Sequence, residues 1–181
     1  MNILLLGVSC VGKSSTGKIL AEKLGYAFYD MDEEIKKKHH ITLEEFVNTG
    51  TLKQRDKKRG NLLRELLRKP KNKVIAVTSI AYKEYIDWIK YREDVFVVEL
   101  TDSAENIYDR LVFSDENDVI YRDDAYRDER RDYYLQSIID DQLFYAKTCY
   151  YLAKYRVDVN NDPQEIVAEK ILQLYLSETN H

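Results

Sequence analysis

The first residues whose types and spacing could do chemistry lie close to the N-terminus. Residues 7–14 read Gly-Val-Ser-Cys-Val-Gly-Lys-Ser and complete the pattern G-x-x-x-x-G-K-[S/T]. In such a loop the glycines let backbone N–H groups turn inward, and those groups hold phosphates together with the start of the next helix. A lysine then adds charge to the outer phosphates, and a hydroxyl binds Mg²⁺. The pattern predicts a nucleotide site made by Gly7, Val11, Gly12, Lys13, Ser14 and Ser15.

A pair of carboxylates follows in Asp30-Met31-Asp32, at the end of a short apolar run. Residues i and i+2 of a strand share a face, so both side chains are expected to point toward the phosphates. One of them would then help to hold the metal, and the other would orient or deprotonate an acceptor hydroxyl. The alternative is structural, because acids also favour the first turn of a helix.

The elements that must position these residues alternate along the chain. Short β-rich runs are separated by longer charged segments with helical spacing, and the runs are Ile3–Leu6, Tyr26–Tyr29, Val74–Val77, Val95–Val98 and Arg156–Val159. Several runs are apolar at consecutive positions, as in strands that are buried on both faces. The alternation predicts an α/β fold with a mostly parallel sheet, as one domain over residues 1–181.

Three helix starts are marked by capping chemistry. Thr42 and Glu45 have the spacing of a capping box, and Asp102 and Glu105 repeat that spacing. Asp162 is expected to cap the last helix, with Pro163 at its first position.

Composition narrows the class of protein. The chain has 181 residues, a net charge of −4 and two cysteines, with no long basic run and no cluster of Cys and His at metal-ligand spacing. No stretch approaches the ~18 apolar residues that a membrane span needs. We therefore expect a cytoplasmic protein that binds neither nucleic acid nor membrane, and that is a monomer.

The motifs together resemble the shikimate kinase family. The likeness covers the 7–14 loop, Leu24-Gly25, Asp30-x-Asp32, the segment Ile41–Phe46 and the segment Arg156–Pro163. The family implies a three-layer P-loop kinase fold, with a five-stranded parallel sheet flanked by helices and a lid at about residues 113–131. It also implies ATP and Mg²⁺ as cofactors.

The resemblance also implies roles for single residues. Lys13 matches the catalytic phosphate-binding lysine, while Ser14 and Asp30 match the hydroxyl and the acid on the side of the metal. Asp32 matches the acid at the acceptor hydroxyl, and Arg55 matches an arginine that grips the acceptor carboxylate. Arg110 matches the residue that stacks on adenine, and Asn160 and Pro163 lie in the loop beside the base. Among the arginines of the lid segment, Arg122 is our candidate for contacting the transferred phosphate.

Three departures from the family concern the acceptor. The family has three glycines after the third strand, where this chain has Thr78-Ser79-Ile80, so Ser79 is expected beside the acceptor. The lid lacks the family's Arg-Pro-Leu-Leu element. Tyr145 or a neighbour stands where the family has a second carboxylate-binding arginine.

The sequence thus predicts an ATP- and Mg²⁺-dependent kinase that phosphorylates a hydroxyl of a small molecule, with an acceptor that differs from shikimate. Two alternatives remain open: a nucleoside or nucleotide kinase, whose base Thr78, Ser79 and tyrosines would line, and a non-catalytic nucleotide-binding protein whose acceptor cavity is filled by Ile80.

Overall fold

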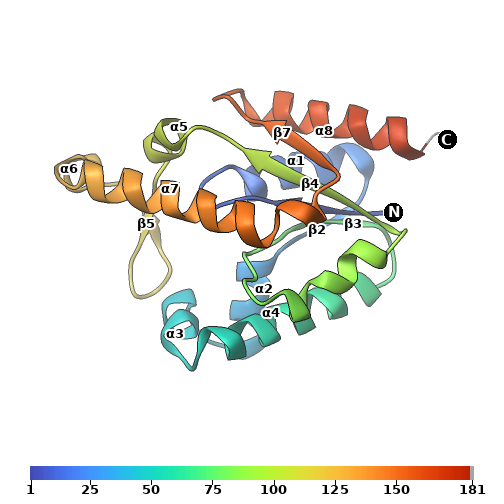
Figure 1. Cartoon of the computed structure of the whole chain (residues 1–181), viewed down its shortest axis with the longest axis horizontal. Coiled ribbons are helices and arrows are strands. Elements are labelled where there is room, and N and C mark those ends of the chain that lie inside the picture. Colours follow the sequence, from blue (N-terminus) through green and yellow to red (C-terminus); the bar gives the residue numbers. More distant parts are fainter. Residues whose placement is uncertain (180–181) are drawn as a thin grey trace.

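Five strands form one parallel sheet at the centre of the computed structural model, which describes residues 1–179 (Figure 1). The strand order is β2-β3-β1-β4-β7. The strands are β1 (Asn2–Leu6), β2 (Ala27–Asp30), β3 (Lys73–Ala76), β4 (Val95–Thr101) and β7 (Tyr155–Asp158). Each predicted run contains or overlaps one of them, and the predicted α/β class is confirmed.

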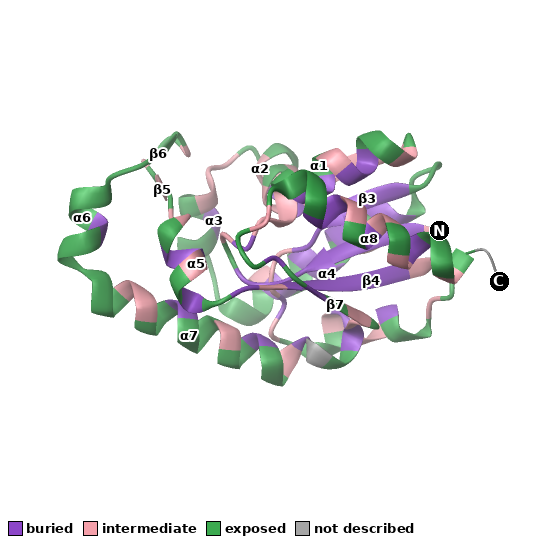
Figure 2. Cartoon of the chain, turned by 90° about the horizontal axis from the view of Figure 1, so that it is seen from above, coloured by how far each residue is buried: buried purple, intermediate pink, exposed green. Residues whose placement is uncertain are grey.

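The central strand β1 explains the continuous apolar runs. All five of its residues are buried, and it pairs with β3 on one side and β4 on the other. Figure 2 shows the central strands buried among helices that are exposed on their outer sides. Burial of both faces removes the alternation that a half-exposed strand would show.

Helices cover both faces of the sheet. α1 (Lys13–Leu24) and α8 (Gln164–Thr179) pack side by side on one face, and α4 (Leu52–Arg68) and α7 (Arg131–Thr148) lie on the other (Figure 1). The remaining helices are α2 (Met31–His39), α3 (Leu43–Asn48), α5 (Ala104–Asp109) and α6 (Asp124–Glu129), with the 3₁₀ turns η1 (Lys83–Tyr85), η2 (Asp87–Tyr91) and η3 (Tyr150–Leu152).

The three predicted helix starts had different outcomes. Thr42 and Glu45 form the predicted capping box of α3, whereas α8 begins at Gln164, so Pro163 precedes the first helical position that it was predicted to occupy. The prediction for Asp102 and Glu105 was wrong, because Ser103 caps α5 by accepting a hydrogen bond from the N–H of Asn106. Asp102 is instead engaged by the guanidinium of Arg110 at 2.6 Å.

The lid segment contains a small antiparallel hairpin that projects from the sheet. Its strands are β5 (Phe113–Ser114) and β6 (Ile120–Tyr121), and α6 follows. Figure 2 shows that the hairpin and α6 are mostly exposed. Across residues 1–179, no helix is both long enough and apolar enough to span a bilayer.

Candidate active site

The carboxyl ends of β1, β2 and β3 bring the predicted chemical residues to one edge of the sheet. The 7–14 loop follows β1, Asp30 ends β2, and Thr78 follows β3. These strands are adjacent and parallel, so their ends meet where open α/β sheets bind ligands. A cavity of about 330 Å³ lies there, lined by Ser9, Cys10, Lys13, Ser14, Asp30, Asp32, Glu33, Lys36, Leu43, Ala76, Thr78, Val112, Phe113, Ser114, Asp118 and Ile120.

The 7–14 loop has the backbone that its glycines permit. Gly7 has a φ of 134°, and a Cβ there would lie 2.5 Å from the carbonyl oxygen of Leu100. Gly12 has a φ of 105° and immediately precedes α1, and Val11 is fully buried beneath the loop. Any side chain at residue 7 would therefore collide with β4, which explains why the loop needs glycine there.

Lys13 folds back over this loop. Its ammonium donates to the carbonyl oxygens of Gly7 at 2.8 Å and Val8 at 2.7 Å. Burial lowers the pKa of Lys13, while the nearby carboxylates of Asp32 and Asp30 act in the opposite direction. The ammonium lies in a poorly solvated place, where a charge acts strongly on a bound anion.

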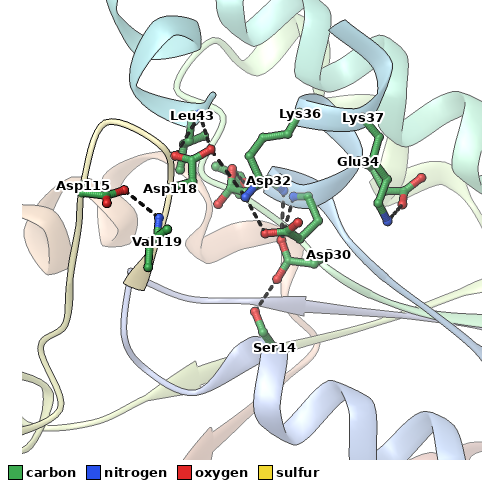
Figure 3. Close-up of polar contacts among 12 residues, drawn as sticks. Ser14, Asp30, Asp32, Glu34, Lys36, Lys37, Leu43, Asp115, Asp118 and Val119 are labelled. Carbon is green, nitrogen blue, oxygen red and sulfur yellow. Dashed lines mark hydrogen bonds and ion pairs between the residues drawn. The ribbon is translucent and has the colours of Figure 1, made fainter. Parts of the chain in front are cut away.

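Ser14 and Asp30 form a contact between α1 and β2. The Ser14 hydroxyl donates to the Asp30 carboxylate, and the other oxygen of Asp30 accepts from the N–H of Asp32 at 2.9 Å (Figure 3). Asp30 thereby caps α2, so the structural alternative for this residue is confirmed, and its role at a metal stays a prediction. A hydroxyl and a carboxylate are oxygen ligands of the kind that Mg²⁺ prefers.

Asp32 lies on the first turn of α2 and faces the cavity. Burial raises its pKa, and the hydroxyl of Thr78, which donates to it at 2.7 Å, works against that rise. No local pattern predicts this hydrogen bond, because Thr78 is 46 residues away from Asp32.

The turn between β5 and β6 forms one wall of the cavity. Asp118 accepts from the N–H of Leu43, with its two oxygens at 3.1 and 2.9 Å, and lies 3.5 Å from the ammonium of Lys36 (Figure 3). Lys36 also pairs with Glu33 at 2.8 Å. Sequence reasoning missed Lys36, although its position four residues after Asp32 on α2 places both on one helix face.

The residues that were predicted to contact the adenine base lie together on the other side of the 7–14 loop from Asp32. Arg110 contacts the carbonyl oxygen of Cys10 at 3.4 Å and the side chain of Asn161 at 2.6 Å. Asn160 and Asn161 both have positive φ, which turns the chain toward Arg110 before Pro163. Asn161 was not predicted individually, and it makes the side-chain hydrogen bond to Arg110.

Three predicted acceptor or lid residues do not line the cavity. Arg55 donates to the carbonyl oxygen of Gly50 at 2.8 Å and lines a separate hollow on α4. Arg122 is exposed and pairs with Asp124 at 2.7 Å. Ser79 lies against Tyr145, whose pKa is raised by complete burial and whose hydroxyl has no regular hydrogen bond within residues 1–179.

The fold and the cavity define the chain as a kinase of the P-loop class that acts on a small molecule. The family model for shikimate kinase matches residues 9–175, and the chain belongs to the shikimate kinase family.

Individual relatives agree with this assignment. A shikimate kinase of Thermodesulfovibrio yellowstonii is 28% identical over 175 residues, which span 96% of this chain and 94% of that protein. The crystal structure of shikimate kinase from Aquifex aeolicus is 26% identical, with a TM-score of 0.73 over 99% of this chain and 98% of the other. Shikimate kinase from Acinetobacter baumannii, in complex with shikimate, is 26% identical, with a TM-score of 0.76 over 98% and 93%.

Proposed function

We propose that this protein uses ATP and Mg²⁺ to phosphorylate a hydroxyl group of a small molecule other than shikimate. The observation that carries the proposal is the cavity itself, which places Asp32 beside Lys13 and the Ser14–Asp30 pair. Phosphoryl transfer needs mainly positioning and charge neutralisation, and these residues are suited to both.

Each residue has one task in this proposal. The N–H groups of the 7–14 loop and Lys13 bind the phosphates, while Ser14 and Asp30 would hold Mg²⁺, which neutralises phosphate charge when bound. Asp32 accepts a hydrogen bond from the acceptor hydroxyl and receives its proton, which its raised pKa favours. Arg110 and the loop from Asn160 to Pro163 contact the base, and Arg122 becomes available to the phosphate when α6 and the hairpin move.

The acceptor part of the proposal rests on the residues that replace the family's glycines. Thr78 is bonded to Asp32, and the N–H groups of Ala81 and Tyr82 both donate to Asp56, at 2.8 and 3.1 Å. These two backbone donors are therefore taken within the protein. Shikimate would meet the Thr78 side chain where the family has a glycine, and the backbone donors of Ala81 and Tyr82, just beyond the glycine positions, are occupied.

The two alternative functions gain no support from the cavity. Its lining includes one aromatic residue, Phe113, but none of the tyrosines that were expected to line a base pocket. Ile80 is buried in the hydrophobic core and leaves the cavity open, contrary to what a filled acceptor site requires.

The decisive experiment measures ADP release with shikimate, sugar acids, polyols and nucleosides, each with ATP or GTP and with or without EDTA. We expect Mg²⁺-dependent turnover with one of these acceptors, and less with shikimate. The Lys13→Ala variant sets the background. Turnover no higher than this background with every acceptor would refute the proposal.

A further inference from the structure

The acceptor end of the cavity is acidic. We use this name for the part of the cavity formed by Asp32, Glu33, Lys36, Thr78 and Asp118. It holds three carboxylates and one ammonium. The other basic side chain of the lining, Lys13, belongs to the phosphate loop and is bonded to that loop.

The single ammonium is already neutralised within the protein. Lys36 lies 2.8 Å from Glu33 and 3.5 Å from Asp118, and its hydrogen bond with Glu33 raises its pKa. Figure 3 shows Lys36 and Asp118 near Asp32. Its charge is therefore shared between two carboxylates before any ligand arrives.

The arginines that could offset this charge are engaged elsewhere. Arg55 is bonded to the carbonyl oxygen of Gly50, outside the cavity. Arg59 is buried on α4, where it pairs with the fully buried Asp56 at 3.2 Å and stacks on the ring of Phe46. Its positive charge lowers the pKa of Asp32, but it does not line the cavity.

An anionic acceptor would therefore meet like charge. Tyr145, which with its neighbours stands where the family has a second carboxylate-binding arginine, is buried against Ser79 and supplies no positive charge. Like charges in a partly buried site repel more strongly than in water. Unfavourable placement of charge is a common means of excluding a wrong ligand.

From this charge distribution we infer that the acceptor carries no anionic group and is a neutral or amine-bearing polyol. The inference rests on the proposed kinase function and specifies its substrate class. An acceptor amine would pair with Glu33 or Asp118, while a neighbouring hydroxyl reaches Asp32. Only the phosphoryl group and the proton of the acceptor hydroxyl are transferred in this reaction.

The test uses ligands that differ only in charge. One set is gluconate, glucitol and 1-amino-1-deoxyglucitol, and the other is shikimate and its methyl ester. Two readouts are taken: ADP release, and the ligand-induced rise in melting temperature with Mg²⁺-ADP present. We expect the neutral or amine member to exceed its carboxylate by more than about tenfold in kcat/KM or in affinity.

Charge-removing variants identify the residues responsible. Asp118→Asn and Glu33→Gln should each reduce the preference for the neutral or amine ligand over its carboxylate by about threefold to tenfold. Glu34→Gln is the matched control, because Glu34 lies on the same helix and pairs with Lys37 and Lys69 outside the cavity. It should leave the preference unchanged.

The outcomes separate this inference from the proposed function. A preference for either carboxylate, or no binding by any neutral or amine member, overturns the inference, even if ATP is turned over with another acceptor. Binding of the neutral or amine members without any phosphorylation would support the inference and refute the kinase proposal.

Discussion

At the scale of single residues, Asp32 is held between two opposing influences. Burial disfavours its charged form, and the Thr78 hydroxyl stabilises that form through a 2.7 Å hydrogen bond. A general base must be ionised to act, so the balance sets the lowest pH at which it can work. Thr78 therefore tunes the proposed base as well as replacing a family glycine.

Thr78→Val should move the acid limb of the activity profile to higher pH. Removing the donor takes away the largest of the influences that oppose burial, so the pKa of Asp32 rises further. The residue is then protonated at pH values where it was ionised before. The measurement is kcat against pH, with Thr148→Val on α7 as a control. An acid limb that stays in place or moves to lower pH would contradict this assignment.

At the scale of elements, two aspartates have separate tasks in the hairpin of β5 and β6: Asp115 fixes its turn, and Asp118 attaches it to α3. Asp115 accepts from the N–H groups of Asn117 and Val119, both at 2.9 Å, and so fixes the turn. Asp118 reaches the N–H of Leu43 on α3 and joins the lid to the acceptor side of the cavity. A substitution of Asp118 should therefore release the hairpin from α3 without changing the conformation of its turn.

Asp118→Ala should open the lid. Losing a hydrogen bond to a charged group costs about 1.5–3 kcal/mol, which corresponds to roughly a 10- to 100-fold shift toward the undocked state. Trypsin cleavage at Arg122, followed by mass spectrometry, reports that state. Glu116→Ala, at an exposed turn position, is the control. Equal cleavage rates in the two variants would show that the hydrogen bond between Asp118 and Leu43 does not keep the hairpin against α3.

Another link between elements is made by Asp56 on α4. It is fully buried and accepts from the N–H groups of Ala81 and Tyr82 and from Arg59. This one carboxylate fixes the segment after β3 against α4.

Asp56→Ala should be strongly destabilising, because it leaves a buried guanidinium and two backbone donors without their acceptor. Breaking a buried charged pair costs about 3–5 kcal/mol, or a fall in melting temperature of roughly 6–20 °C for a domain of this size. Thermal unfolding measures the change. Lys57→Ala, exposed on the same helix, should stay within about 0.5 kcal/mol of the parent protein. Equal melting temperatures for the two variants would disprove the role of Asp56.

At the scale of the whole molecule, the sheet order gathers distant segments at one edge. β1 is central, and the loop after it lies between residues that follow β2, β3 and β4. A ligand at that edge therefore touches several elements at once. Its binding energy acts on the folding equilibrium of the entire chain.

Mg²⁺ with a non-hydrolysable ATP analogue should therefore raise the melting temperature. At about 100 times the dissociation constant the gain is about 2.7 kcal/mol, or roughly 5–10 °C. Lys13→Ala should lose most of this shift, and EDTA should reduce it, while Lys18→Ala, exposed on α1, should keep it. A shift retained in full by Lys13→Ala would argue against the role of that lysine.

The sequence by itself determined the features that depend on contiguous residues. The 7–14 loop, the Asp30–Asp32 pair, the capping box at Thr42 and the five strands are local patterns, because backbone geometry and hydrophobic periodicity act over a few positions. These patterns were sufficient to predict the fold class and the family. The family resemblance also placed Arg110 beside the loop at residues 160–163.

Only the tertiary structure decided which side chains reach the acceptor. Arg55 matches the family pattern but turns to Gly50, whereas Lys36 and Asp118 enter the cavity without any motif to mark them. The bonds of Thr78 to Asp32 and of Asp118 to Leu43 join residues 46 and 75 positions apart. Such contacts depend on how elements pack and which rotamers that packing allows, and neither is encoded in local spacing.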